Sequence, residues 1–211
     1  MATPRSTNSP VSIAILAKAP IPGHAKTRLI PTIGAHAAAV LQERLTERTL
    51  MTALASAVGP VTVWCAPDAT HDSFLKFVAQ LRVTIRPQPA GDLGARMLMA
   101  AAAANGPVLV IGTDCPALTD VHLRGAGQAL LDGNDVVLIP AADGGYVLIG
   151  MRRAQPALFS AIPWGTSTVL ADTRARIIDQ RLSLIERPPL WDIDTAADLE
   201  RLEREYPELK L

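Results

Sequence analysis

Carboxylates stand just beyond predicted apolar strands at two places in the chain. Asp114 follows the apolar run 108–111, and a carboxylate at the end of a central strand is well placed to hold a hard cation such as Mg²⁺. Asp192 and Asp194 alternate along an extended segment, which puts both on one side. They repel each other unless a cation or a basic group lies between them. These three residues form a candidate metal site, although Asp114 equally fits the start of the turn before Pro116.

A second candidate is the loop AKAPIPGHAKTRL, which follows the first apolar run. Gly23 allows backbone N–H groups to approach an anion, and Lys26 and Arg28 add positive charge. No acidic residue offsets these charges within residues 18–34. The spacing is neither that of a Walker A loop nor GxGxxG. The loop therefore predicts a phosphate-binding segment, with a solvated basic loop as the alternative.

Two weaker motifs carry both a functional and a structural interpretation. Gly144 and Gly145 after Asp143 permit a ligand to approach the backbone, but Asp-Gly between two predicted strands is also a strong hairpin signal. Thr195 and Asp198 have the spacing of a capping box at a helix start. The capping box leaves the carboxylates that precede it without a structural role.

Composition bounds the class of protein. The 211 residues carry 20 Lys plus Arg and 20 Asp plus Glu, and this neutral balance argues against a dedicated nucleic-acid binder. A hydrophobic content of 49% excludes a disordered chain. Cys65 and Cys115 show no zinc-site spacing, which suits a reducing cytoplasm, and Cys115 lacks a nearby His that would make it a nucleophile. No apolar run reaches the length of a membrane helix.

Strand and helix patterns alternate along the chain, which predicts an α/β fold with a mostly parallel sheet and helices on both faces. One domain is expected over residues 11–211, after a disordered leader over residues 1–10. Ligands of such sheets bind beyond the carboxyl ends of the strands. The predicted strands are 11–17, 61–65, 83–86, 108–111, 135–140, 146–151 and 182–186, and the predicted helices are 35–58, 70–80, 92–104, 119–131, 166–180 and 195–205.

Five segments, AKAPIPGHAKTRL, QPAGDLGARM, IGTDCPAL, PAADGGYVLIG and WDIDTAADL, occur in this order. The set resembles the DUF2064 family of small bacterial transferases, which lies in the nucleotide-diphospho-sugar transferase superfamily with the Rossmann-like glycosyltransferase-A fold. The resemblance spans about residues 11–200. AKTRL and DIDT are also similar to segments of 2-phospho-lactate guanylyltransferases and, more distantly, of molybdenum-cofactor nucleotidyltransferases. Family members are often labelled glycosyltransferases, and links to arsenosugar biosynthesis have been proposed.

The resemblance implies roles for matched positions. It gives Lys26, Arg28 and Asp114 catalytic roles and places the turn at residues 143–145 near the acceptor. One departure is Lys18-Ala-Pro, which stands where nucleotidyltransferases carry a Gly-Gly pair. The implied nucleotide-binding residues are Ala17, Lys18, Gly23, Lys26, Arg28, Gln88, Gly91 and Asp92, the acceptor-binding residues are Asp143, Gly144 and Gly145, and the Mg²⁺ or Mn²⁺ ligands are Asp114, Asp192 and Asp194.

The expected function is a Mg²⁺-dependent transferase that moves a nucleotidyl group from a nucleoside triphosphate to a small phosphorylated or anionic acceptor. The alternative is glycosyl transfer from a nucleotide-diphospho-sugar, and a third possibility is a non-catalytic nucleotide-binding module. The basic loop, expected to be exposed, favours nucleotidyl transfer because a triphosphate carries more charge near the first strand. Intact carboxylates argue against the non-catalytic module. The base, the sugar, the acceptor and the oligomeric state stay open.

Overall fold

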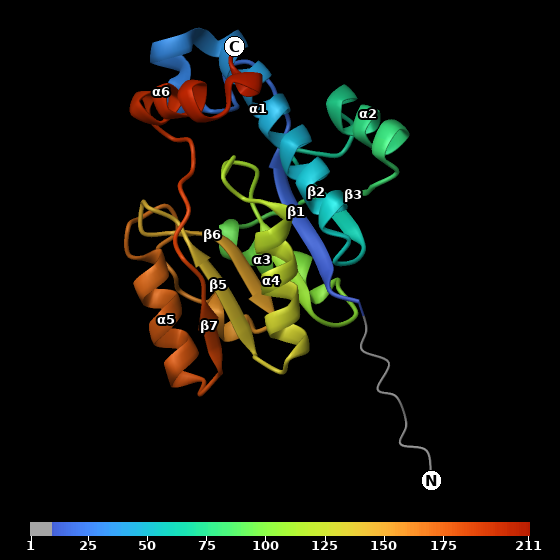
Figure 1. Ribbon diagram of the computed structural model, residues 1–211, viewed down its shortest axis with the longest axis vertical. Helices are drawn as coiled ribbons and strands as arrows, with labels where there is room; N and C mark the ends of the chain where they lie inside the picture. Colours follow the sequence, from blue (N-terminus) through green and yellow to red (C-terminus); the bar gives the residue numbers. More distant parts are fainter. Residues whose placement is uncertain (1–9) are drawn as a thin grey trace.

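A computed structural model describes residues 10–211, so that the predicted leader falls almost wholly outside the described residues. Seven strands form one sheet in the order β3-β2-β1-β4-β6-β5-β7 (Figure 1). Among the strands of residues 10–211, only β6 runs antiparallel to its neighbours β4 and β5, which confirms the mostly parallel sheet. The strands are β1 (Ser12–Lys18), β2 (Val61–Ala66), β3 (Thr84–Pro87), β4 (Val108–Ile111), β5 (Val136–Pro140), β6 (Tyr146–Met151) and β7 (Leu184–Glu186).

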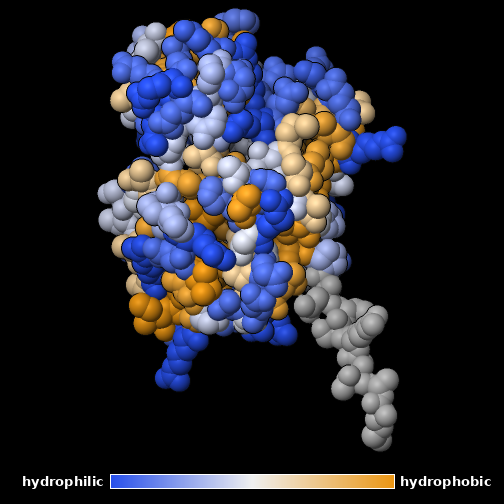
Figure 2. Space-filling view, viewed as in Figure 1, coloured by the Kyte–Doolittle hydropathy of each residue, from blue (hydrophilic) through white to orange (hydrophobic). Residues whose placement is uncertain are grey.

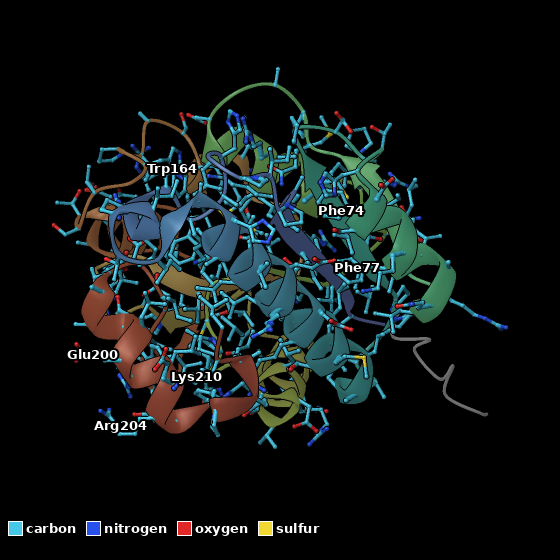
Figure 3. The ribbon with its side chains drawn as sticks, turned by 90° about the horizontal axis from the view of Figure 1, so that it is seen from above. Phe74, Phe77, Trp164, Glu200, Arg204 and Lys210 are labelled. Atoms are coloured by element: carbon cyan, nitrogen blue, oxygen red, sulfur yellow. The ribbon has the colours of Figure 1, made fainter. Side chains whose placement is uncertain are left out.

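Helices cover both faces of the sheet because successive strand residues point to opposite sides. Ile13 and Ile15 of β1 pack with α1, α2 and α4, whereas Ala14 packs with α3 and α5. Phe74 and Phe77 of α2 lie on the first face, far across the view from Trp164 in Figure 3. The helices are α1 (Ile30–Ser56), α2 (Asp72–Leu81), α3 (Leu93–Ala102), α4 (Asp120–Leu131), α5 (Val169–Asp179) and α6 (Ala196–Glu205), with 3-10 turns η1 (Thr27–Leu29), η2 (Pro156–Leu158) and η3 (Pro207–Leu209).

The first helix begins earlier than the sequence predicts. α1 starts at Ile30 rather than at residue 35, so the loop after β1 is shorter than the expected 18–34. Pro31 is tolerated there because the first helical turn needs no donor from its backbone. Gly34, with φ 80° and ψ 160°, interrupts the helix one turn later and hides that first turn from the sequence pattern.

A third apolar cluster joins α6 to the start of α1, and the two lie side by side at the top of Figure 1. Leu199 and Leu202 of α6 share it with Leu41 and Leu45 of α1. The surface over α6 is mainly hydrophilic in Figure 2, so the helix buries one face only. The cluster includes the segment before α6, through Trp191 and Ile193, and so fixes that segment against α1.

The point where the chain changes direction across the sheet lies between β1 and β4. From β1 the chain proceeds outward to β2 and β3, and from β4 it proceeds to the opposite edge. Ligands of open α/β sheets bind at such a switch point. No helix within residues 10–211 combines the length and the apolar character needed to cross a bilayer.

Candidate functional site

A cleft of about 680 Å³ opens beyond the carboxyl ends of β1 and β4. We call residues 16–28 and 88–96 of its wall the basic side, and residues 141–147 and 164–169 the aromatic side. The end of β4 and the segment before α6 lie in the centre. The lining includes the predicted site residues Ala17, Lys18, Lys26, Arg28, Gln88, Gly91, Asp92, Asp114, Asp143, Gly145, Asp192 and Asp194, but neither Gly23 nor Gly144.

Lys26 and Asp114 form the central ion pair. The Lys26 ammonium lies 2.6 Å from Asp114 Oδ1 and also donates a hydrogen bond of 2.8 Å to the Ile193 carbonyl. The Ile193 N–H in turn donates to the Asp114 carbonyl at 2.9 Å, which closes a ring between three segments. The Lys26 side chain is only 5% exposed. The expectation of an exposed lysine is therefore wrong, because this side chain turns inward to two acceptors.

Arg28 is exposed, as expected, and pairs with the carboxylate of Asp194. Its side chain keeps 70% of its accessible surface. Asp192 and Asp194 flank the buried Ile193 and both line the cleft, which confirms that they share one side. They have different surroundings, however, because only Asp194 has an ion-pair partner among the described residues.

Asp192 is the carboxylate whose environment is least favourable for charge. Burial, and then the nearby carboxylates of Asp143, Asp114 and Asp194, raise its pKa to about 6. The neighbour with the largest effect is Asp143, which the sequence analysis assigned to the acceptor and not to this cluster. Asp192 therefore lies among carboxylates whose repulsion a cation would relieve.

These residues fit a divalent cation only in part. No three His, Cys, Asp or Glu side chains among residues 10–211 converge to form a metal site on their own. Mg²⁺ in nucleotide enzymes usually takes one or two carboxylates and completes its shell with water and substrate phosphates. Asp114 and Asp192, which both line the cleft, supply two such carboxylates. Asp194 already accepts from Arg28 and Asp114 from Lys26, so a cation would share each of these two carboxylates with a basic side chain.

On the basic side, some predicted nucleotide-binding residues have structural partners. The Gln88 side-chain amide donates to the carbonyls of Ala17 and Trp64, at 3.2 and 2.8 Å, and so joins the ends of β1 and β2. Asp92 is the N-cap of α3. Arg96, one turn into α3, lines the cleft and donates to the Gln88 side-chain oxygen at 3.4 Å. Sequence analysis missed Arg96, although it lies in the quoted segment GDLGARM.

Sequence analysis also missed the aromatic side, except for the turn at residues 143–145. Trp164 stacks on Phe159 at 6.3 Å between ring centroids and meets Tyr146 edge to face at 6.5 Å. The indole lies directly over Gly94 of α3, where a Cβ would come within 2.5 Å of Nε1. Thr166 follows in the same loop. The sequence signal that could have indicated this side is a tryptophan, Trp164, in a loop that contains Pro and Gly and precedes a helix.

The turn between β5 and β6 is a hairpin turn that also borders the cleft. Asp143 Oδ1 accepts a hydrogen bond of 2.8 Å from the Gly145 N–H, so this is the hairpin turn that the sequence allowed. Asp143 and Gly145 also line the cleft. Gly144 points away, against the backbone of Ser167, and is needed for that close approach.

Cys115 lies in the lining of the cleft but is not prepared for nucleophilic chemistry. Burial raises the pKa of its thiol to about 12. The thiolate is the nucleophilic form of cysteine, so a pKa this high leaves the side chain unreactive at neutral pH. This agrees with the sequence analysis, which found no histidine placed to activate it.

Comparisons with known proteins give the family and the fold. The family described as "Uncharacterized protein conserved in bacteria (DUF2064)" matches residues 49–166. A crystal structure from Desulfovibrio desulfuricans G20, provisionally described as a nucleotide-diphospho-sugar transferase, is 31% identical over 93% of this chain and 87% of its own, with a TM-score of 0.84. No curated protein is significantly similar in sequence.

More distant structures share the fold. A nucleotidyl transferase from Methanothermobacter has a TM-score of 0.65 at 16% identity, over 95% of this chain and 99% of that one. The 4-diphosphocytidyl-2C-methyl-D-erythritol synthase of Anaerococcus prevotii has a TM-score of 0.58 at 13% identity, over 90% and 95% of the two chains. Together with the match over residues 49–166, these comparisons show that the chain belongs to the DUF2064 family and has the fold of nucleotidyl and nucleotide-diphospho-sugar transferases.

Proposed function

We propose that this protein is a transferase that uses an activated nucleotide together with Mg²⁺ or Mn²⁺, and that nucleotidyl transfer is its reaction. The observation that carries the proposal is the division of charge in one cleft. Lys18, Arg28 and Arg96 line its basic side, and the carboxylates of Asp114 and Asp192 line its centre. The cleft lies at the switch point of the sheet, where nucleotides bind in related architectures.

In this reaction an oxygen of the acceptor attacks the α-phosphorus of a nucleoside triphosphate, and pyrophosphate leaves. Arg28, Lys18 and Arg96 bind the phosphates through charge-assisted hydrogen bonds and stabilise the transition state electrostatically. Asp114 and Asp192 hold the divalent cation together with the phosphates. When bound there, the cation neutralises charge that develops on the phosphate oxygens.

Two residues prepare the site before the nucleotide enters. Lys26 pairs with the Asp114 carboxylate and fixes its position relative to the segment before α6. Arg28 is held by Asp194 in an exposed pair, and such pairs contribute at most about 1 kcal/mol. A phosphate can therefore replace Asp194 as the partner of Arg28 at little cost.

Glycosyl transfer from a nucleotide-diphospho-sugar is the second candidate, and one observation favours it. Lys26 is occupied by two acceptors, so the loop after β1 offers fewer free charges than a triphosphate site built on both of its basic residues. The Desulfovibrio desulfuricans G20 protein, at 31% identity, is itself described in these terms. In this reaction the same basic side would hold the leaving diphosphate.

Calorimetric titration at fixed Mg²⁺ and fixed salt tests the proposal, because both ligand classes are anions and salt screens each of them. Nucleotidyl transfer predicts tighter binding of a nucleoside triphosphate than of the matching diphosphate or diphospho-sugar, and release of pyrophosphate with an acceptor. The reverse order, with slow hydrolysis of the diphospho-sugar, would select the second candidate. Failure of every nucleotide to bind would reject both.

The matched variants are Arg28→Ala and Arg124→Ala. Both arginines are exposed and paired with an aspartate, but Arg124 pairs with Asp120 on α4, outside the cleft. Loss of a charge-assisted contact should weaken nucleotide binding by about 1.5–3 kcal/mol in Arg28→Ala only.

A further inference from the structure

The two sides of the cleft differ in charge. Every Lys, Arg and His of the described lining comes from the basic side, within residues 18–28 or at Arg96. The aromatic side contributes one charged group, Asp143. An anionic group placed against the aromatic side would therefore meet the Asp143 carboxylate and no cation from residues 141–147 or 164–169.

The helix that begins at the aromatic side is poorly placed to replace a cation. Two N–H groups near its start already have acceptors, since Leu170 donates to the Gly144 carbonyl at 2.9 Å and the N-cap residue Thr168 donates to Thr166 Oγ1 at 3.4 Å. Asp172, in the first turn, accepts from the Thr168 hydroxyl at 2.9 Å. Its negative charge opposes the helix dipole at this end.

The remaining surface of the aromatic side is an apolar wall with hydrogen-bonding groups beside it. Trp164 and Tyr146 form the wall together with Val169. Asp143 and the hydroxyl of Thr166 stand beside it in the lining. Pockets of this kind take the apolar face of a ligand on aromatic side chains and fix its orientation with a few polar groups. A carboxylate accepts hydrogen bonds from hydroxyl groups but repels phosphates.

We propose that the aromatic side binds the acceptor, and that this acceptor is an uncharged, hydroxyl-bearing ring compound of the monosaccharide class. Its apolar face lies on Trp164 and Tyr146, and its hydroxyls bond to Asp143 and Thr166. The hydroxyl that attacks the donor gives its proton to the Asp143 carboxylate. The assignment rests on the proposed function, because a transferase is what requires a second substrate in this cleft. It replaces the phosphorylated or anionic acceptor that the sequence led us to expect.

The test compares neutral sugars with their phosphates on the full chain. Glucose, galactose and mannose, each paired with its 1-phosphate, are titrated by calorimetry with Mg²⁺ and the tightest-binding nucleotide present. We expect at least one neutral sugar to bind about tenfold more tightly than its phosphate. Tighter binding of the phosphates, or no binding of any neutral sugar, overturns the inference. Nucleotide binding is measured first, without sugar, so that a failure of the proposed function is recognised separately. If no nucleotide binds, the sugars and their phosphates are compared without nucleotide.

Three variants locate the sugar site. Trp164→Ala removes the wall, and Gly94→Ala displaces the indole from the α3 side without changing Trp164, since the new Cβ would lie 2.5 Å from its Nε1. Gly125→Ala is the matched control, because it makes the same substitution within a helix and its Cβ would meet only Arg187 at 3.6 Å. Trp164→Ala should lose about tenfold in sugar affinity and keep its nucleotide affinity, Gly94→Ala should lose a similar factor in sugar affinity, and the control should keep both affinities. Equal loss of both affinities in Trp164→Ala, or unchanged sugar affinity in Trp164→Ala and Gly94→Ala, contradicts the assignment.

Discussion

The ion pairs of Lys26 and Arg28 differ in how much water reaches them. Lys26 is 5% exposed and donates to two acceptors, whereas Arg28 is 70% exposed and has one partner. An exposed pair is screened by water and contributes little to stability. A lysine withdrawn from water is costly to leave unpaired, and its removal also leaves its acceptors without a donor. Neighbouring basic residues of one loop therefore have different tasks.

Lys26→Met and Arg28→Ala should separate these tasks. Lys26→Met leaves the Asp114 carboxylate and the Ile193 carbonyl without their donor, and we expect a loss of about 1–3 kcal/mol in the free energy of unfolding. Arg28→Ala should cost less than about 1 kcal/mol in stability. Urea unfolding of both variants measures the difference. Equal loss of stability in both would show that the inward position of Lys26 has no energetic consequence.

Asp192 should make the stability of the free protein depend on pH. Its pKa in the folded protein, about 6, lies above the ordinary value of 3.8, so the folded state binds more protons than the unfolded state between these values. The free energy of unfolding should therefore fall as pH rises from about 4 to about 6, by on the order of 1 kcal/mol because solvent partly screens the group. Asp192→Asn should abolish this slope in urea unfolding measured across the window. Parallel curves for the two proteins would contradict the prediction.

At the scale of elements, the sequence predicts strands well because each has a simple local signal. The run 108–111 is wholly apolar and is β4 as predicted, and β6 likewise has the predicted bounds. Helix starts are equally well marked where a side chain caps them, as Thr119 and Thr195 do. The start of α1 was misplaced because Gly34 interrupts its pattern.

The candidate site follows the same logic. The sequence could predict that Asp114 and Asp192 lie close together, because the carboxyl ends of parallel strands meet at one edge of the sheet. Trp164 and Arg96 could not, because their approach to the cleft depends on how α3 and the loop before α5 pack, which no local pattern encodes. The inward turn of Lys26 has the same origin, since its second acceptor, Ile193, is 167 residues away.

Gly144→Ala tests the contact between the β5–β6 turn and the start of α5. Gly144 has φ 92°, and an added Cβ would collide with the backbone of Ser167. Gly133, with φ 104° and open space around it, is the matched control for backbone strain alone. We expect Gly133→Ala to cost about 1–2 kcal/mol and Gly144→Ala clearly more, measured by urea unfolding. Equal losses of stability in the two variants would mean that the loop containing Ser167 moves aside freely.

At the scale of the whole molecule, the cleft unites segments from both ends of the chain. The central carboxylates come from the end of β4 and from the segment before α6, and that segment is fixed by the apolar cluster between α6 and α1. The aromatic side comes from the β5–β6 turn, from β6 and from the loop before α5. A ligand that contacts all of these regions binds only when the sheet, α1 and α6 are assembled. Its binding free energy therefore stabilises the entire fold.

Thermal unfolding should report this coupling directly. A nucleotide present at 100 times its Kd adds about 2.7 kcal/mol, which for a chain of this length corresponds to a rise of about 5–11 °C in Tm. The rise should require Mg²⁺ or Mn²⁺, because the Asp114 and Asp192 carboxylates repel phosphates without a cation between them. Asp114→Asn should remove the cation-dependent part of the rise, whereas Asp120→Asn, which alters an exposed pair on α4, should keep all of it. If the cation-dependent rise in Tm is undiminished in Asp114→Asn, Asp114 serves only as the ion-pair partner of Lys26, and other residues bind the cation.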